Sequence, residues 1–348
     1  MHKSSIFLCA AALLLAACTS APSGSLPRGK SPVDIAEFDK VFDDVTAVKG
    51  DSLHSLMVVK DGKVIYERYA PGHGPDEAHV MNSVSKSFLS CAVGFAVQEG
   101  LLTVQDKVVK FFGDDELPPV AERSERLLNL TIHDLLRMSS GFDNERVDRR
   151  NSENWARDFL AIPQTWEPGS RFHYNSMNSY ILSVIVSRVT GEKVNDYLQP
   201  RLFTPLAIES HEWQESPQGY NAGGWGMYIT TESLAKISLF VLQKGVWNGK
   251  RLLNEAWFDE ACKAQIMEYA GEDITPEEAA VKYAGDQWNM GYGYQFWMDD
   301  CGGCLLDGAR GQFGIVMPDK NAVIATTANV GNNKILFYSA WKHIHDQL

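Results

Sequence analysis

The stretch Met81-Asn82-Ser83-Val84-Ser85-Lys86-Ser87-Phe88 contains a Ser-x-x-Lys tetrad at the start of a predicted apolar helix. Positions i and i+3 of a helix share one face, so the Lys86 amine should lie one turn from the Ser83 hydroxyl. A serine hydroxyl is a weak nucleophile at neutral pH, and a neighbouring deprotonated amine can activate it. The stretch therefore predicts a nucleophilic serine at a helix start.

Two further copies of the tetrad occur, at Ser233-Leu234-Ala235-Lys236 and Ser339-Ala340-Trp341-Lys342. Both fall inside amphipathic helical patterns, where we expect the hydroxyl on an ordinary helix surface. Ser83 alone follows a loop rich in proline and glycine, which places its backbone N–H among the free amides at the positive end of a helix. Such an amide can help to bind the developing oxyanion of an acyl transfer, so the context selects Ser83.

Residues 1–17 have the pattern of a signal peptide, because a basic start precedes an apolar run too short to span a bilayer permanently. The run ends in Leu15-Ala16-Ala17-Cys18, which resembles the bacterial lipobox and implies a lipid-carrying N-terminal Cys18 after cleavage. An ordinary signal peptide with a chance cysteine is the alternative. With Thr19 next, the resemblance implies an envelope protein anchored in the outer membrane and facing the periplasm. Residues 18–30 are rich in Ser, Pro and Gly and predict a tether.

The composition limits the classes of function. Residues 31–348 are long enough to bury a large core in one or two lobes, and we expect one functional domain there. The net charge of −12, without basic runs, argues against nucleic-acid binding. No segment after the first seventeen residues approaches the length of a transmembrane helix.

Cysteines are sparse in this chain. Cys91 and Cys262 fall in apolar helical patterns and are predicted core residues. Cys301-Gly302-Gly303-Cys304 has no second pair of ligands nearby, so it does not predict a zinc site. In an oxidising envelope it predicts either a short disulfide in a hairpin tip or two free thiols, and both remain open.

The pattern of elements predicts an α/β fold of the α+β type. Hydrophobic periodicity and end signals predict helices near 31–45, 83–99, 179–190, 231–243 and 335–344, with a further helix start at the capping box of Thr131 and Asp134. Strand patterns occur at 56–66, 292–298 and 311–327, whereas 142–165 reads as irregular and the acidic 265–290 as a loop or lid. We therefore expect an antiparallel sheet built from both chain ends, flanked by terminal helices, with an inserted, mostly helical lobe.

Five segments, in this order and spacing, resemble the serine β-lactamase and penicillin-binding-protein superfamily. The branch most similar is that of class C β-lactamase-related esterases and 6-aminohexanoate-dimer hydrolases, over about residues 54–345. The segments are 81–88 quoted above, Leu135-Leu136-Arg137-Met138-Ser139-Ser140-Gly141, Pro168-Gly169-Ser170-Arg171-Phe172-His173-Tyr174-Asn175-Ser176, Gly223-Gly224-Trp225-Gly226-Met227 and Gly308-Ala309-Arg310-Gly311-Gln312. The resemblance implies a β-lactamase-like fold and makes residues 31–348 a β-lactamase-related serine hydrolase domain.

The resemblance also implies roles for individual residues. Ser83 would be the acylated nucleophile, and Lys86 and Tyr174 would form the base pair that takes its proton and passes it to the leaving group. An amine and a phenol coupled in a partly buried cleft can lower each other's cost of deprotonation. The family pattern Tyr-x-Asn reads Tyr-Asn-Ser here, so either Asn175 or Ser176 would hydrogen-bond Lys86 or the substrate amide.

The third element of the family, Lys-Thr-Gly or His-x-Gly, is replaced by Leu306-Asp307-Gly308. The missing cation meets the substrate carboxylate in β-lactamases and peptidases, so its absence argues against strong β-lactam binding. Gly308 would lie at the site and Ala309 would supply the second oxyanion amide. Arg310 would either replace the missing cation or be a surface arginine.

Three tryptophans could form walls of the cleft: Trp166, Trp225 and Trp288. Aromatic residues are more often part of a core than of a site, so only the glycine-flanked Trp225 is favoured.

Taken together, the sequence predicts a serine hydrolase that needs no metal or cofactor and cleaves a small-molecule ester or amide through an acyl-enzyme on Ser83. Its other expected partner is the membrane, through a lipid on Cys18. One alternative is a β-lactamase or D-alanyl-D-alanine peptidase. The other is a non-catalytic, penicillin-binding-like envelope protein that retains Ser83 by descent.

Overall fold

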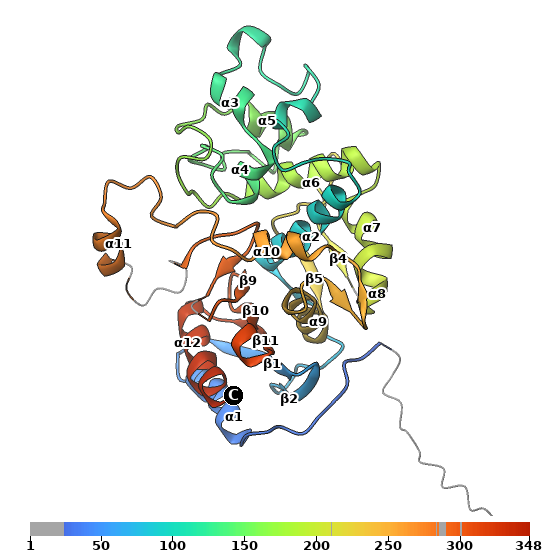
Figure 1. The fold of residues 1–348 in the computed structure, drawn as a ribbon, viewed down its shortest axis with the longest axis vertical. Helices are drawn as coiled ribbons and strands as arrows, with labels where there is room; N and C mark the ends of the chain where they lie inside the picture. Colours follow the sequence, from blue (N-terminus) through green and yellow to red (C-terminus); the bar gives the residue numbers. More distant parts are fainter. Residues whose placement is uncertain (1–23, 210, 283, 285–289, 300) are drawn as a thin grey trace, which may run out of the picture.

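The computed structural model describes residues 24–209, 211–282, 284, 290–299 and 301–348. The predicted signal peptide, the predicted lipidation site Cys18 and the candidate wall Trp288 lie outside the described residues. Figure 1 shows a sheet with helices against it at one end of the molecule and a mostly helical part at the other.

A six-stranded antiparallel sheet joins the two ends of the chain, in the order β2-β1-β11-β10-β9-β8. The N-terminal and C-terminal strands meet where β1 pairs with β11, with Val58 opposite Ile324. The strands are β1 Ser52–Lys60, β2 Lys63–Tyr69, β8 Trp297–Met298, β9 Cys304–Gly308, β10 Gln312–Met317 and β11 Ala322–Asn329. The predicted sheet from both chain ends is therefore confirmed.

Turn residues set the register of the first hairpin. Asp61 and Gly62 both have positive φ, of 50° and 74°, the geometry of a tight hairpin turn between twisted strands. The predicted hairpin at 56–66 is confirmed and extends further at both ends. The expected strand at 292–298 is wrong for most of its length, because only Trp297–Met298 pairs with β9.

Each face of the sheet is covered by helices. One face packs apolar side chains against α1 Ala36–Thr46 and α12 Asn333–His343, and the other packs against α9 Thr231–Leu242. The first helix was expected from residue 31 but begins at Ala36, where Asp34 Oδ1 accepts from the Ala36 N–H at 3.0 Å. Ser31 instead bonds within a turn to Val33.

The central part of the chain forms the helical lobe (Figure 1). Its helices are α2 Ser85–Gln98, α3 Glu125–Asn129, α4 Ile132–Leu136, α5 Trp155–Leu160, α6 Ser176–Thr190, α7 Val194–Leu198, α8 Thr204–Leu206 and α10 Glu255–Ala261. Helix α11 Pro276–Lys282 lies on a stretch of chain that extends to one side of the molecule (Figure 1). The capping box before α4 is present. Two expectations were wrong: 142–165 contains α5, whose Trp155 and Phe159 are buried, and 265–290 contains α11.

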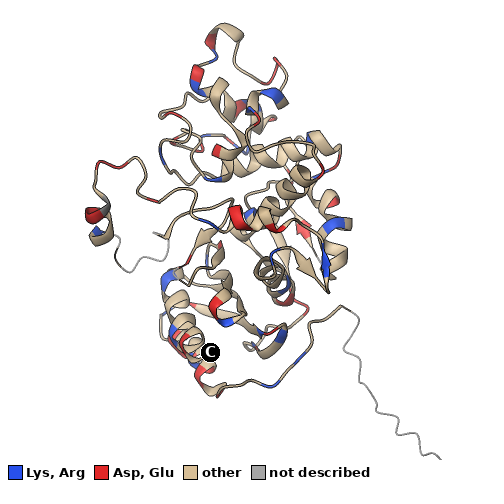
Figure 2. Ribbon diagram, in the orientation of Figure 1, with Lys and Arg blue, Asp and Glu red and all other residues tan. Residues whose placement is uncertain are grey.

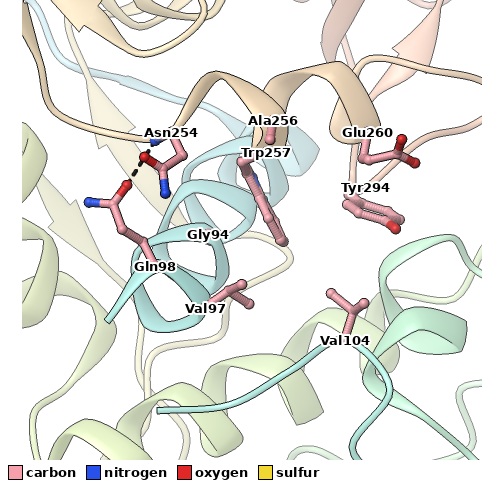
Figure 3. A pocket seen from close by; sticks show the side chains of 9 residues that line it. All are labelled: Gly94, Val97, Gln98, Val104, Asn254, Ala256, Trp257, Glu260 and Tyr294. Carbon is pink, nitrogen blue, oxygen red and sulfur yellow. Dashed lines mark hydrogen bonds between the residues drawn. The ribbon is translucent and has the colours of Figure 1, made fainter. Parts of the chain in front are cut away.

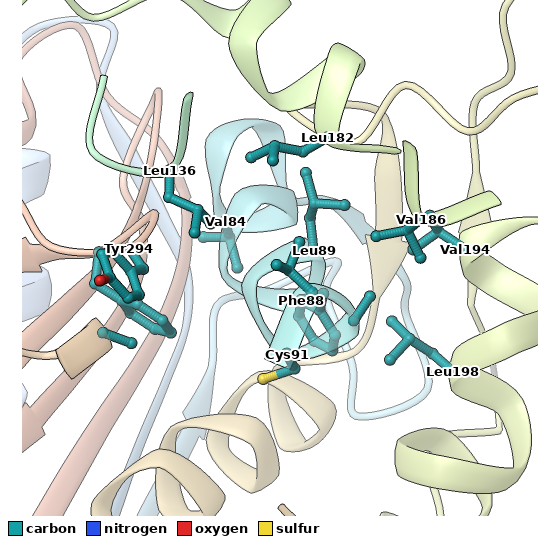
Figure 4. Close-up of a cluster of buried hydrophobic side chains, with 14 of the residues drawn as sticks. Val84, Phe88, Leu89, Cys91, Leu136, Leu182, Val186, Val194, Leu198 and Tyr294 are labelled. Carbon is teal, nitrogen blue, oxygen red and sulfur yellow. The ribbon is translucent and has the colours of Figure 1, made fainter. Parts of the chain in front are cut away.

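Helix α2 is buried along its length and carries the tetrad into the middle of the molecule. Figure 4 shows Phe88, Leu89 and Cys91 of α2 among apolar side chains of α6 and α7, such as Leu182 and Leu198. A helix that is apolar all round is stable only inside a core. The fold therefore places the first turn of α2, with Ser83 and Lys86, where the lobe meets the sheet.

Shorter strands complete the architecture: β3 His79–Val80, β4 Glu212–Trp213, β5 Met227–Ile229, β6 Val246–Trp247 and β7 Lys250–Arg251. Strand β3 pairs with β5 and leads directly into the tetrad segment. Among the described residues, no helix combines the length and the apolar character that a membrane span requires.

The four described cysteines are free thiols. Cys91 is fully buried in α2, as predicted for a core residue, while Cys262 is partly buried. Cys301 and Cys304 lie at the turn between β8 and β9, so the predicted hairpin tip is present and the structure shows two thiols there.

Candidate active site

Ser83 lies in a 3₁₀ turn, Asn82–Val84, immediately before α2. Asn82 adopts a φ of 47°, and its side-chain amide donates to the Ala309 carbonyl at 2.7 Å, which holds this turn against the end of β9. Lys86 follows one turn later, and its Nζ donates to Ser83 Oγ at 3.1 Å. The structure thus brings the hydroxyl and the amine of the tetrad together.

The Lys86 amine is buried and makes only neutral contacts. Lys86 is 1% exposed, and its Nζ donates to the Gly224 carbonyl at 2.8 Å and to Ser176 Oγ at 3.2 Å. Burial lowers the pKa of Lys86 to about 7, although the Glu145 and Asp307 charges oppose the shift. A large share of the molecules therefore carries a neutral, basic amine at neutral pH.

Tyr174 completes the cluster from the segment before α6. The Ser83 hydroxyl lies close enough to its phenol to oppose the rise of the Tyr174 pKa, and Lys86 Nζ lies 4.8 Å from its ring centroid. The ring stacks on Trp297 and meets Tyr292 edge to face. Burial raises the pKa of Tyr174 above its usual value, so the phenol holds its proton at neutral pH. Burial therefore lowers the pKa of the Lys86 amine and raises that of the Tyr174 phenol, so the amine is the easier of the two to deprotonate.

Ser176, and not Asn175, contacts Lys86. Asn175 is fully buried; its Oδ1 accepts from the Met177 N–H as the N-cap of α6, and its amide nitrogen donates to the Asn144 carbonyl at 2.9 Å. Because both ends of its side chain are used, Asn175 shapes the start of the helix and leaves the polar contact to its neighbour.

The end of β9 packs directly against the turn that contains Ser83. A Cβ added at Gly308 would lie 2.3 Å from the Met81 carbonyl oxygen, so only glycine permits this close approach. The hydrogen bond from Asn82 then holds the exposed Ala309 next to the same turn. Gly308 and Ala309 are thus both placed beside Ser83.

The side of the site formed by β9 carries a carboxylate. Arg310, the candidate replacement cation, is exposed and donates to Asn329 Oδ1 at 2.7 Å. Asp307 is half-buried, accepts from the Asn333 amide at 3.0 Å, and influences the pKa of both Lys86 and Tyr174. The negative charge of Asp307 disfavours an anionic substrate group on this side.

Trp225 borders the cluster, because it directly follows the Gly224 carbonyl that binds Lys86. The Arg149 guanidinium lies 4.6 Å from its ring centroid. Trp166, by contrast, packs against Arg171 and His173 and makes none of the Lys86 contacts.

Sequence reasoning missed several neighbours of Lys86. Glu145 accepts the Ser176 N–H and forms an ion pair of 3.6 Å with Arg149. Both residues lie in 142–165, the stretch predicted to be irregular. Their opposite charges, four residues apart in the sequence, were the signal that could have predicted this ion pair. Tyr292 and Trp297, which hold the Tyr174 ring, read only as β-prone aromatics.

Neither of the other tetrads places its serine on a surface. Ser233 and Ser339 are each 5% exposed, so the expected surface positions were wrong. The Ser233 hydroxyl pairs with Thr230, and the Ser339 hydroxyl donates to Asp44 at 2.8 Å.

An apolar pocket of about 340 Å³ lies further along α2 (Figure 3). Val97, Val104, Trp257 and Tyr294 line it, and Trp257 lies so close to Gly94 that an added Cβ there would be 2.8 Å from the indole. No residue of the Ser83 cluster lines this pocket, so it is separate from the candidate site.

Charged residues are interspersed over the described chain, with Lys and Arg next to Asp and Glu in both parts of the molecule (Figure 2). The Ser83 cluster itself consists of hydroxyl, amine and phenol groups. Two groups of metal-ligand donors lie outside it: His54 with His73 and His79, and Cys301 with Asp319 and His345.

Comparison with known proteins identifies the family. Residues 38–346 match the Beta-lactamase family. The chain belongs to the beta-lactamase family. The 6-aminohexanoate-dimer hydrolase of Paenarthrobacter ureafaciens is 23% identical over 275 residues, which cover 70% of this chain and 69% of that relative.

Solved structures share the fold of this chain. A Bacillus anthracis protein assigned as a 6-aminohexanoate-dimer hydrolase superposes with a TM-score of 0.72 and 17% identity, over 92% of this chain and 86% of that one. EstCE1, a hydrolase with promiscuous acyltransferase activity, has a TM-score of 0.69 and 14% identity, over 89% of this chain and 98% of that one. The predicted superfamily and the predicted β-lactamase-like fold are both confirmed.

Proposed function

We propose that this protein is a serine hydrolase that cleaves a small ester or amide through a covalent acyl-enzyme on Ser83. One observation carries the proposal: Lys86 is buried with a pKa of about 7, and its Nζ lies 3.1 Å from the Ser83 hydroxyl. A general base is most effective when its pKa is near the working pH, and burial of this amine achieves that match.

In the first step, Lys86 accepts the Ser83 proton while Ser83 Oγ attacks the acyl carbon. The bond from the acyl carbon to the leaving oxygen or nitrogen then breaks, and the leaving group takes up the proton, so that Ser83 becomes an ester. In the second step, water attacks this ester, releases the acid and restores the Ser83 hydroxyl.

Tyr174 is the proton relay in this scheme. Its phenol lies beside the Ser83 hydroxyl and keeps its proton at neutral pH, so it can donate to the leaving group while it takes the proton held by Lys86, which returns to its neutral form. The pair predicted as a joint base is therefore divided, with Lys86 as the base and Tyr174 as the donor.

Backbone amides would stabilise the oxyanion. Ser83 stands at the start of α2, where backbone N–H groups have no partner within the helix, and Ala309 is held against the same turn by the Asn82 hydrogen bond. Trp225 would line the substrate side of the cluster beside Gly224.

We infer a neutral or cationic group on the substrate near β9. Leu306 stands where the cation of β-lactamases and peptidases was expected, its neighbour Asp307 carries a negative charge, and Arg310 is bonded to Asn329. The named activities of the relatives, a dimer hydrolase and a hydrolase with acyltransferase activity, suit esters and linear amides. We also propose that a lipid on Cys18 tethers the enzyme to the envelope, which mass measurement of the N-terminal peptide from native cells would test.

The test is a screen of short acyl esters, linear amides and a cephalosporin, with a fluorophosphonate probe and mass spectrometry of the labelled peptide. We expect the probe on the peptide that contains Ser83 and turnover of at least one uncharged ester or amide. Efficient turnover of the cephalosporin alone would favour the β-lactamase alternative. Absence of both labelling and turnover would favour the non-catalytic alternative.

A further inference from the structure

Three histidines outside the Ser83 cluster face one another. One ring nitrogen from each of His54, His73 and His79 can be chosen so that all three lie within 4.8 Å of one another. The His54 and His73 rings stack with centroids 4.1 Å apart, and His79 lies 5.5 and 5.8 Å from them. Imidazole is the side chain that zinc and neighbouring transition metals most often select.

The fold brings His54 to this place by an irregularity in β1. The pairing of β1 with β11 shifts between Leu53 and Ser55, so His54 is the extra residue of a β-bulge. A bulge takes its side chain out of the regular alternation and often re-aims it for a purpose. His54 therefore does not belong to either packed face of the sheet.

The segment after β2 supplies the other groups. Ala70 N–H donates to the His54 carbonyl at 2.8 Å, and His73 N–H donates to the Ala70 carbonyl at 3.0 Å, so the chain folds back toward β1. The Glu77 carboxylate lies 2.9 Å from His73 Nδ1 and 3.6 Å from His79 Nε2. A carboxylate thus stands between two of the imidazoles.

Two ring nitrogens in the group are buried without a hydrogen bond in the described part of the chain, although His79 Nε2 lies 3.6 Å from the Glu77 carboxylate. His54 Nδ1 and His79 Nε2 are buried and have no hydrogen-bond partner among the described residues, and the His79 side chain is only 10% exposed. Buried polar atoms are nearly always paired, so such atoms suggest a missing ligand. The other nitrogen of His54 lies 3.0 Å from the Ser52 hydroxyl, a contact that would orient the ring and fix its tautomer.

We propose that His54, His73, His79 and Glu77 form a binding site for a divalent transition metal ion, with Zn²⁺ as the ion that best suits three imidazoles and one carboxylate. Tetrahedral zinc with Zn–N bonds of ~2.0–2.1 Å sets its ligand atoms about 3.4 Å apart. The donors must therefore close slightly around the ion, and rotation of the partly exposed His73 and Glu77 side chains supplies that movement.

A bound ion would hold in place the segment of chain that leads from His79 to Ser83. His79 precedes Ser83 by four residues, and β3, which contains it, pairs with β5. An ion that joins His79 to His54 would fasten this segment to β1. Because four protein ligands fill the coordination shell, the ion would be structural and would take no part in the chemistry at Ser83.

The test uses the full chain, purified without a polyhistidine tag and stripped with EDTA. Titration with ZnCl₂ in a calorimeter should show one saturable equivalent, and titration with CoCl₂ should give the visible absorption bands of a tetrahedral site. Saturating zinc should also raise the melting temperature, because it binds only the folded state. Absence of a saturable equivalent in the stripped wild type would overturn the proposal.

Variants then locate the ion. His73→Ala and His79→Ala should each weaken zinc binding by more than the roughly 10- to 100-fold that loss of an outer-shell partner costs. His211→Ala is a matched control, because both of its ring nitrogens are already bonded to Asn195 and Gln199. Cys301→Ser tests the second donor group, and loss of binding in that variant with retention in His73→Ala would refute the assignment. Far-UV circular dichroism confirms that each variant is folded. His73 is partly exposed, so its variant keeps the test valid if His79→Ala unfolds.

Discussion

The Ser83 and Ser233 tetrads share a sequence pattern and a place in a helix, yet they have different surroundings. Both stand at the start of a buried helix, and Lys86 and Lys236 are 1% and 5% exposed. Burial lowers the pKa of both amines. However, Lys86 Nζ contacts the Ser83 hydroxyl, whereas Lys236 Nζ donates to the Ala207 carbonyl at 2.7 Å.

The two lysines differ because other segments of the chain place different groups next to their amines. Tyr174 and Ser176 come from the helical lobe and present a phenol and a hydroxyl to the first tetrad. The second tetrad meets a backbone carbonyl, with the Glu232 and Glu209 charges favouring its ammonium form. Lys86 therefore has a hydroxyl from which it can take a proton, whereas the Lys236 amine is bonded to a carbonyl oxygen, which has no proton to give.

Replacing the two serines is the most severe test of this contrast. Ser83→Ala should lower kcat/KM for the best ester by ~10⁴-fold or more, because the nucleophile is lost. Ser233→Ala should leave kcat/KM nearly unchanged. Steady-state kinetics and mass spectrometry of the acyl adduct measure both effects, and thermal melts verify folding. Equal losses in the two variants would mean that the tetrads do not differ in function.

Replacing the two lysines separates catalysis from stability. Lys86→Met should reduce acylation by ~10³-fold or more, whereas Lys236→Met should retain activity. Lys86→Met should also melt at a higher temperature than the wild type. The pKa of Lys86 falls from 10.5 in the unfolded chain to about 7 in the fold, so the charged amine penalises folding fully below pH 7 and the penalty fades as the pH rises to 10.5.

Melts at pH 6 and pH 9 check the sign of this effect. The gain in melting temperature of Lys86→Met over the wild type should be larger at pH 6 than at pH 9. A lower melting temperature for the variant at both values would show that the amine stabilises the fold, and a normal rate of acylation would remove Lys86 as the base.

The sequence predicted the main elements of the fold that carry the two tetrads, but not the contacts that make the tetrads different. Periodicity, the Asp61-Gly62 turn and the capping box at Thr131 act locally, so the sheet, the flanking helices and the start of α4 could be foreseen. The helix at Trp155–Leu160 was missed because one and a half turns show too little periodicity to detect.

Features of the site that depend on distant contacts could not be read from the sequence. The Gly224 carbonyl that binds Lys86, and the Trp297 ring that stacks on Tyr174, are brought in from far along the chain. The fold predicted from the five family segments was right because their order carries more information than any one motif.

Tyr174→Phe should have a smaller effect than the loss of Ser83 or Lys86. Removing the phenol takes away the proposed relay and should lower kcat/KM by about 10²- to 10³-fold, the range for loss of one acid–base group. The aromatic ring remains packed on Trp297, so stability should change little. Tyr292→Phe is the matched control, because it removes a buried phenol from the same ring cluster and should keep the rate. An unchanged rate in Tyr174→Phe would limit Tyr174 to packing.

The pH dependence of the rate is the smallest of the expected effects, and it tests the pKa of the Lys86 amine directly. Lys86 is active when neutral, and its pKa is about 7, so kcat/KM for an uncharged ester should fall about tenfold per pH unit below 7 and level off above it. Lys236→Met should leave unchanged the pH at which the rate falls, because the Lys236 amine is bonded to the Ala207 carbonyl and not to Ser83. Initial rates between pH 5 and 9, with melts to confirm folding at each pH, give the profile. A limb near pH 4 would indicate a carboxylate base, and a rate still rising at pH 9 would mean that burial does not lower the pKa of Lys86 enough for it to serve as the base at neutral pH.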